Sequence, residues 1–185
     1  MSTTWIVLGV IAVVLVLMYN SLVGKKNEVD NIFAGVDAVL KKRYDLIPNL
    51  VASVSKYMEH ERGLLEKVTE LRSQAMKPGI SDEKVIEIDR QISSALGSIM
   101  VAVENYPDLK ANENVMHLQR TLHEVEAQIA AARRAYNQAV TDYNNAIEMI
   151  PTNFMASMMN YKRKQVFEIS EAERENVNVK ELFNS

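Results

Sequence analysis

The residues that could bind a catalytic metal are three histidines and the acidic side chains near them. His60-Glu61 begins like the His-Glu-x-x-His motif, in which two histidines one helical turn apart bind one zinc ion. Leu64 stands where the second histidine would be. His117 and His123 are six residues apart, which places them on different faces of a helix. The sequence therefore predicts solvated or capping histidines and no metal site.

Other catalytic patterns are also missing from the sequence. It contains no glycine-rich loop after a strand and no Gly-x-Ser-x-Gly nucleophile motif. Carboxylates such as Glu124 and Glu126 are two residues apart and do not face each other on a helix. The chain has no cysteine, and its net charge of −3 gives no reason to expect nucleic acid as a partner. We therefore expect no enzymatic activity and no cofactor.

The elements that carry these residues are predicted to be helices, so the fold class is all-α. The clearest helix is expected from Val115 to Ile150, because apolar residues recur there with the three-and-four spacing of a coiled coil. At about 1.5 Å per residue this helix would be roughly 54 Å long, so it must lie along partners for most of its length. Its seam comprises Val115, Leu118, Leu122, Val125, Ile129, Ala132, Tyr136, Ala139, Tyr143, Ala146 and Ile150.

Three further helical stretches are predicted. The first runs from Asn27 to about Met76, with a kink or break between Tyr44 and Pro48, because an interior proline removes a backbone donor and clashes with the preceding turn. Lys77-Pro78-Gly79 is a strong turn signal. The other two stretches follow that turn and the long helix, at about 81–104 and 154–159.

The first 24 residues predict a transmembrane anchor. Trp5 to Tyr19 contains no ionisable group except the tyrosine, and uncharged flanks extend the run to the roughly 20 residues that a bilayer requires. Trp5 and Tyr19 lie at its ends, where aromatic rings prefer the headgroup level. No basic residue precedes the run and no small-x-small cleavage site follows it, which favours an anchor over a signal peptide. Lys25 and Lys26 follow at once, which predicts the N-terminus outside and the rest in the cytoplasm.

We accordingly divide the chain into an anchor (1–24), a helical body (25–168) and an acidic C-terminal tail (169–185). The composition of the tail favours disorder. The alternative is an extended peptide that docks on a partner.

A set of short motifs extends over nearly the whole chain. They are Lys42–Val51, Tyr57, His60-Glu61, Tyr106–Ala111, Leu118-Gln119, Glu126–Arg133, Tyr136-Asn137, Tyr143-Asn144, Pro151, Asn153, Phe167 and Val179–Phe183. In these motifs the sequence resembles the LemA family. The resemblance implies an up-and-down four-helix bundle behind one N-terminal membrane helix, in a bacterial membrane protein. It supplies no activity, although members are associated with envelope processes and membrane proteases.

Two groups of residues are candidates for contact with a partner or a second subunit. The first is Arg43, Asp45, Pro48 and Asn49, near the basic cluster 41–43. On a straight helix this cluster would lie about 30 Å from the membrane, too far for lipid attraction. A protein partner and an ion pair with a neighbouring helix both remain open.

The second group repeats with the heptad: Tyr136 with Asn137, and Tyr143 with Asn144. These residues belong either to the core or to a contact between subunits.

Together these features predict a membrane-anchored homo-oligomer, a scaffold that self-assembles at the cytoplasmic face of the bacterial membrane and organises or shapes it. The alternative is an adaptor that binds a membrane protease or signalling protein through residues 43–49 or the tail.

Overall fold

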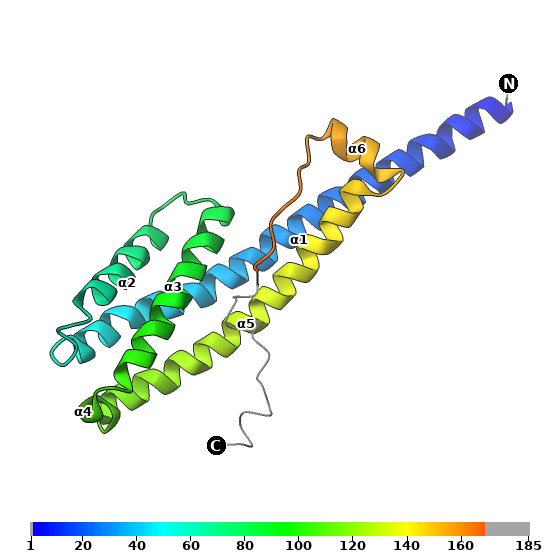
Figure 1. Ribbon diagram of the computed structural model, residues 1–185. Coiled ribbons are helices and arrows are strands. Elements are labelled where there is room, and N and C mark those ends of the chain that lie inside the picture. The colour runs from blue at the N-terminus through cyan, green and yellow to red at the C-terminus, as the bar shows by residue number, and fades with distance from the viewer. Residues whose placement is uncertain (1, 169–185) are drawn as a thin grey trace, which may run out of the picture.

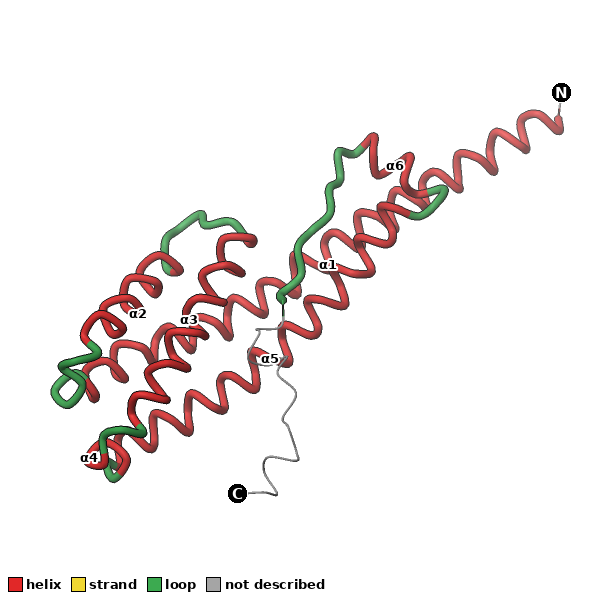
Figure 2. The backbone as a smooth tube through the Cα atoms, in the orientation of Figure 1, coloured by secondary structure: helices red, strands yellow, loops and turns green. Residues whose placement is uncertain are grey.

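The computed structural model describes residues 2–168, and these form helices and connecting loops without any strand (Figure 1, Figure 2). The all-α prediction is confirmed, as is the long apolar helix at the N-terminus. The predicted tail, 169–185, lies outside the described residues. The helices are α1 (Ser2–Val54), α2 (Arg62–Ala75), α3 (Asp82–Val103), α4 (Pro107–Lys110), α5 (Glu113–Glu148) and α6 (Thr152–Met158).

The two longest helices, α1 and α5, lie antiparallel along each other and form the axis of the molecule (Figure 1). Phe33 on α1 meets Tyr136 on α5, with their ring centroids 5.3 Å apart. Farther along, Arg43 bonds Glu126. The apolar seam predicted for α5 is thus covered mainly by α1, and both helices contribute to one core.

The remaining helices divide the molecule into two halves. In the far half, α2 and α3 reverse direction twice and pack beside the end of α1 and the beginning of α5, which makes an up-and-down four-helix bundle (Figure 2). In the near half, α1 and α5 continue as a pair, and within the described part of the chain only α6 and the segment after it lie against them. Four helices therefore share a core over only part of the length of α1.

The beginnings of α3 and α5 follow from capping residues. The Ser81 hydroxyl accepts a hydrogen bond from the Lys84 amide, and the Asn112 side chain accepts from the amides of Asn114 and Val115. Such side chains satisfy donors in the first turn that have no partner within the helix. The predicted helix boundaries near 81 and 115 agree with these caps.

Of the kink or break predicted at Tyr44 to Pro48, the break is wrong, because α1 continues through Pro48 to Val54. Proline has no amide hydrogen, so the Tyr44 carbonyl lacks its usual donor four residues later. The Arg72 Nε of α2 donates to that carbonyl at 2.7 Å. A neighbouring helix thus supplies the hydrogen bond that the proline removes.

The helix expected to reach Met76 without interruption is instead divided by a loop, residues 55–61. This loop reverses the chain so that α2 can pack back against α1. Met58 lies in the loop and is fully buried, which closes the end of the core.

Candidate functional site

A network of charged side chains lies inside the far half of the bundle. Arg43 of α1 is 0% exposed. Its Nη1 donates to Ser93 Oγ at 2.9 Å and to Glu126 Oε1 at 2.8 Å, and its Nη2 donates to Asp89 Oδ1. Arg133 of α5 donates to the other oxygen of Asp89 and to Ser93. We call these five residues the arginine network.

The arginine network joins α1, α3 and α5 at one point. Burial alone would lower the pKa of Arg43, but the negative charges of Asp89 and Glu126 outweigh it and raise that pKa. The guanidinium therefore stays charged at any ordinary pH, and its position depends on its carboxylate partners. A buried charge that loses its partner is strongly destabilising.

The prediction that Arg43 contacts a partner or a second subunit is therefore corrected, because Arg43 has no exposed surface. The alternative of an ion pair with neighbouring helices is confirmed by the bonds to Asp89 and Glu126. Sequence reasoning overlooked Asp89. It follows Ile88 on the apolar face of α3, and an acidic residue at the edge of such a seam was the available signal.

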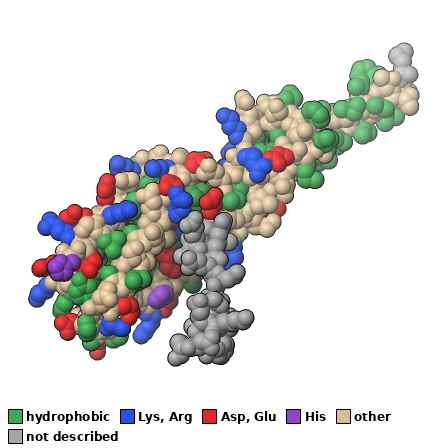
Figure 3. Space-filling model, viewed as in Figure 1, with side chains coloured by type: hydrophobic (Ala, Val, Ile, Leu, Met, Phe, Trp, Pro, Cys, Tyr) green, Lys and Arg blue, Asp and Glu red, His purple; other side chains and the backbone are tan. Residues whose placement is uncertain are grey.

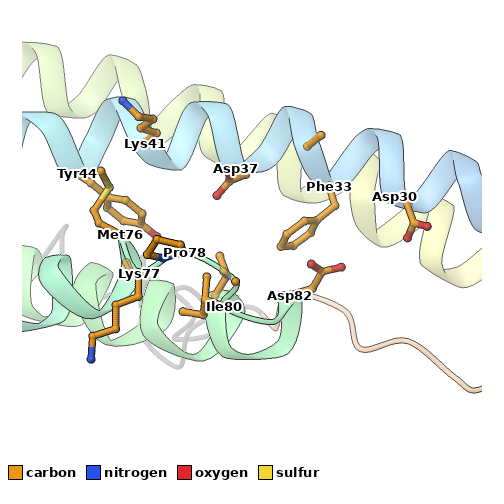
Figure 4. Close-up of a pocket in the computed structure, with 14 residues that line it drawn as sticks. Asp30, Phe33, Asp37, Lys41, Tyr44, Met76, Lys77, Pro78, Ile80 and Asp82 are labelled. Carbon is orange, nitrogen blue, oxygen red and sulfur yellow. The ribbon is translucent and has the colours of Figure 1, made fainter.

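Beside the network lies an open pocket of about 590 Å³ between α1, the turn after α2 and the start of α3. Figure 4 shows Asp30, Asp37 and Lys41 along α1, with Ile80 and Asp82 across from them. No cluster suited to a metal ion occurs among the described residues, so these carboxylates do not make one here.

Tyr44 lines the same pocket from α1. Its hydroxyl is buried and has no hydrogen-bond partner within residues 2–168. Burial raises the pKa of this phenol, so it remains protonated and acts only as a neutral donor or acceptor. The guanidinium of Arg43 lowers this pKa and offsets the effect of burial only in part.

The heptad-repeated asparagines of α5 hold an extended segment that we call the strap, residues 161–167. The Asn137 side chain accepts from the Phe167 amide and donates to the Phe167 carbonyl, both at 2.8 Å. The Asn144 side chain makes the same pair of bonds to Lys164, both at 3.0 Å. Each asparagine thus forms hydrogen bonds with both the backbone amide and the carbonyl of one strap residue, as a neighbouring β-strand would.

The spacing of these bonds explains the repeat. Seven residues of helix rise about 10.5 Å. The three residues from Lys164 to Phe167 span about the same distance in an extended chain. Because the two lengths match, a heptad of helix can bind every third residue of the strap.

The repeated tyrosines belong to the core, which decides between the two interpretations left open by the sequence. Tyr136 is 1% exposed and lies between the rings of Phe33 and Phe167, each 5.3 Å from it. Tyr143 is also buried, and its hydroxyl donates to the Lys162 carbonyl at 3.1 Å. Tyr136, Asn137, Tyr143 and Asn144 thus hold the strap of their own chain. The sequence indicated the repeat but not its partner, because the strap lacks a regular pattern.

Lys164 completes the attachment of the strap through its charge. Its ammonium lies 2.6 Å from Asp30 of α1 and 3.9 Å from Asp82 of α3. Burial alone would raise the pKa of Asp30, but hydrogen bonds from Lys164 and Lys26 outweigh it and lower that pKa. Burial raises the pKa of Asp82, and Lys164 offsets this only in part. One lysine therefore links three segments.

Comparison with known proteins places the chain in a family. The LemA family profile matches residues 32–180, most of the chain. The chain belongs to the LemA family. It is 29% identical to Protein LemA of Metamycoplasma hominis over 96% of its own length and 81% of that protein. It is also 24% identical to Magnetosome protein MamQ 2 of Paramagnetospirillum magneticum over 88% of its own length and 70% of that protein.

The structure brings two of the LemA-like motifs together at the far end of the molecule. Tyr106, before α4, donates its hydroxyl to Glu61 Oε2 at 2.7 Å. The loop after α1 and the loop after α3 are thereby tied to each other. Glu61, which resembled part of a zinc motif, has this structural role, and His60, His117 and His123 are all exposed.

Three other candidate contact residues of this LemA-family protein remain on the surface. Asp45, Pro48 and Asn49 are exposed on the outer face of α1. Asp45 pairs with Lys41 at 3.3 Å and lies 4.0 Å from Arg72. They lie on one continuous helix, and their side chains are accessible to a partner.

The N-terminal part of α1 is the one candidate membrane span among the described residues. It projects beyond the other helices, and Figure 3 shows its surface covered by hydrophobic side chains. Trp5 is 73% exposed, Tyr19 is 49% exposed, and the first fully buried residue of α1 is Leu22. The 20 residues before Leu22 would be about 30 Å long, the thickness of the hydrocarbon layer.

Proposed function

We propose that this LemA-family protein is a membrane-anchored scaffold without enzymatic activity. In this proposal the start of α1 spans the bacterial cell membrane with the N-terminus outside. The body stands on the cytoplasmic face, where copies associate side by side and organise the membrane.

The observation that carries the proposal is the continuity of α1. Residues 2–54 are one helix, so no flexible linker separates the apolar segment from the core of the body. The part from Lys25 to Val54 would be about 45 Å long. A body attached in this way keeps a fixed orientation relative to the apolar segment, which suits a protein that builds ordered contacts with its neighbours.

The subunit contact cannot use the α5 seam, because α1 and the strap already cover it. The exposed face of α1 around Asp45, Pro48 and Asn49 is the surface that we assign to it. Anchoring in two dimensions raises the effective concentration of the copies, so a weak contact on this face would suffice.

Cysteine crosslinking in membranes tests the proposal, because the chain has no native cysteine. We expect Asn49→Cys to form disulfide-linked dimers on mild oxidation in vesicles. Lys67→Cys, exposed on α2, is the matched control and should not. The mass of the full-length protein in detergent, measured by light scattering, should exceed that of a monomer.

Three results would each overturn one part of the proposal. If alkaline carbonate extracted the protein from membranes, the proposed membrane span would be wrong. A monomeric mass together with no crosslinks at position 49 or 67 would contradict self-assembly. It would favour binding to a partner such as a membrane protease. Labelling of Asn49→Cys by an impermeant thiol reagent in intact cells would reverse the orientation.

A further inference from the structure

Four large hydrophobic side chains are exposed where α5 turns into α6. Met149 is 63% exposed, Ile150 78%, Phe154 67% and Met158 83%. Ala156, in the same short helix, is buried against the body. We call the four exposed residues the apolar corner. Exposure of this kind is costly in water and marks a surface that contacts something apolar.

The register between α1 and α5 gives the height of the apolar corner. Ten residues separate Phe33 from Arg43 on α1, and ten separate Tyr136 from Glu126, their partners on α5. Continued toward the N-terminus, this one-to-one register places Glu148, the last residue of α5, opposite Ser21. The uncharged stretch of α1 ends only at Gly24. The corner therefore begins at the level where the apolar segment of α1 ends (Figure 1).

We propose that the apolar corner inserts into the membrane surface, at the boundary between headgroups and acyl chains, as a second contact beside the span. This inference rests on the proposed anchoring by α1. A bilayer that surrounds the uncharged residues of α1 must also meet the start of the corner, because Met149 directly follows Glu148, which lies opposite Ser21.

The charges near the corner fit a lipid surface. Lys25, Lys26, Lys162 and Arg163 lie in the segments that adjoin it. Lys26 pairs with Asp30 and Arg163 with Glu148, but Lys25 and Lys162 have no carboxylate partner among residues 2–168. Basic side chains beside apolar ones are the composition of segments that lie in an anionic interface.

A second copy of the chain fits the corner less well than lipid does. A stable protein interface involves about 20 to 30 residues on each side. The corner offers four side chains on and beside a seven-residue helix. Insertion into lipid needs no larger complementary surface.

Tryptophan fluorescence in vesicles tests the proposal, because Trp5 is the only tryptophan of the chain. The probe membrane is a mixture of neutral and anionic phospholipids with bromine atoms on the acyl chains, which quench a tryptophan at contact. The test protein is full-length Trp5→Phe with Phe154→Trp. The matched control is Trp5→Phe with Val101→Trp, since Val101 is 71% exposed on α3 in the far half.

The expected result is a blue-shifted emission at position 154 that brominated lipid quenches, more strongly when the bromine is near the headgroup. Position 101 should emit like a tryptophan in water and should not be quenched. Both sites are exposed, so the substitutions leave the fold intact, which circular dichroism verifies.

Other outcomes overturn the proposal, and they separate it from the proposed function. Quenching of Trp5 in the wild type without quenching at position 154 would support the proposed span and contradict insertion of the apolar corner. A blue shift at position 154 that brominated lipid does not quench, and that weakens on dilution with lipid, would assign the corner to a second copy. Absence of quenching at Trp5 would contradict the proposed span, and insertion of the apolar corner would be contradicted with it.

Discussion

The two halves of the body enclose the same pair of helices by different means. In the far half, α2 and α3 cover α1 and α5, and charged side chains meet inside at the arginine network. In the near half residues 2–168 provide no further long helix, and the strap covers the pair through neutral asparagine side chains and one lysine. A buried charge that loses its partner costs several kcal/mol, whereas loss of a part-buried hydrogen bond between neutral groups costs about 1 kcal/mol. The far half should therefore unfold as a unit, and the near half should open locally first.

The halves meet at Arg133 and Phe167. The Arg133 guanidinium lies over the Phe167 ring, 5.5 Å from its centroid, while its Nη2 bonds Asp89. One residue of α5 thus belongs to the arginine network and also contacts the end of the strap.

Removal of the central carboxylate of the network should have the largest effect. Asp89→Asn keeps the shape of the side chain but leaves Arg43 and Arg133 without their shared negative charge. We expect a loss of about 3–5 kcal/mol in the free energy of unfolding. Denaturant unfolding in detergent, followed by circular dichroism, measures it. Glu124→Gln, at an exposed site on α5, is the control, and equal effects for both variants would contradict a special role of the network.

Loss of the bond that supports Pro48 should have the next largest effect. Arg72→Met leaves the Tyr44 carbonyl without a donor and should cost about 1–3 kcal/mol of the free energy of unfolding. Pro48→Ala restores an amide donor within α1. The cost of Arg72→Met should therefore be smaller in the Pro48→Ala background, and a double-mutant cycle with no coupling would show that Arg72 does not compensate for the proline.

Release of the strap should have a smaller and local effect. Asn144→Ala removes both part-buried hydrogen bonds to the Lys164 backbone, which join neutral groups, so we expect a loss of about 1 kcal/mol in the free energy of unfolding. Hydrogen exchange should become faster at the Lys164 and Phe167 amides and stay unchanged in α2 and α3. The control is Asn145→Ala, at the exposed neighbouring position, and faster exchange throughout the body would contradict independent opening of the near half.

The smallest effect should be a change in how stability depends on pH in acid. The lowered pKa of Asp30 means that its contribution to stability is present above its ordinary value of 3.8 and is lost as the pH falls through the folded value. The raised pKa of Asp82 has the opposite sign, because its protonation favours the folded state. In Asp82→Asn this compensation is absent, so the stability of the attached strap should fall more steeply as the pH is lowered. Thermal melts between pH 6 and about 3 measure this, and an unchanged slope would contradict it.

Periodicity predicted the parts of the fold that local pattern controls. The spacing of apolar residues and the turn at Lys77–Gly79 gave the helical stretches near 81–104 and 115–150 correctly. The continuity of α1 could not be predicted, because the donor for the Tyr44 carbonyl comes from Arg72, 28 residues away. Local rules for proline describe a helix alone in water and not one packed against an arginine.

The candidate site was predicted in its residues more than in its contacts. Tyr136, Asn137, Tyr143 and Asn144 were identified from their heptad repeat, and they do act together. Their partner is an extended segment of the same chain, which has no periodicity to reveal it. Arg43 was identified too, but its burial depends on Asp89, which is distant in sequence.

The unbroken α1 also means that a tilt of its apolar segment displaces the far end of the body. Membrane helices tilt by about 20° on average, and they tilt further in a bilayer thinner than their apolar length. Since α1 passes from the apolar segment to the far loop without a break, the proposed anchoring requires the body to tilt by the same angle. Over the roughly 45 Å from Lys25 to Val54, a tilt of 20° moves the far end sideways by about 15 Å. A small change in bilayer thickness would thus become a lateral displacement of the whole far half.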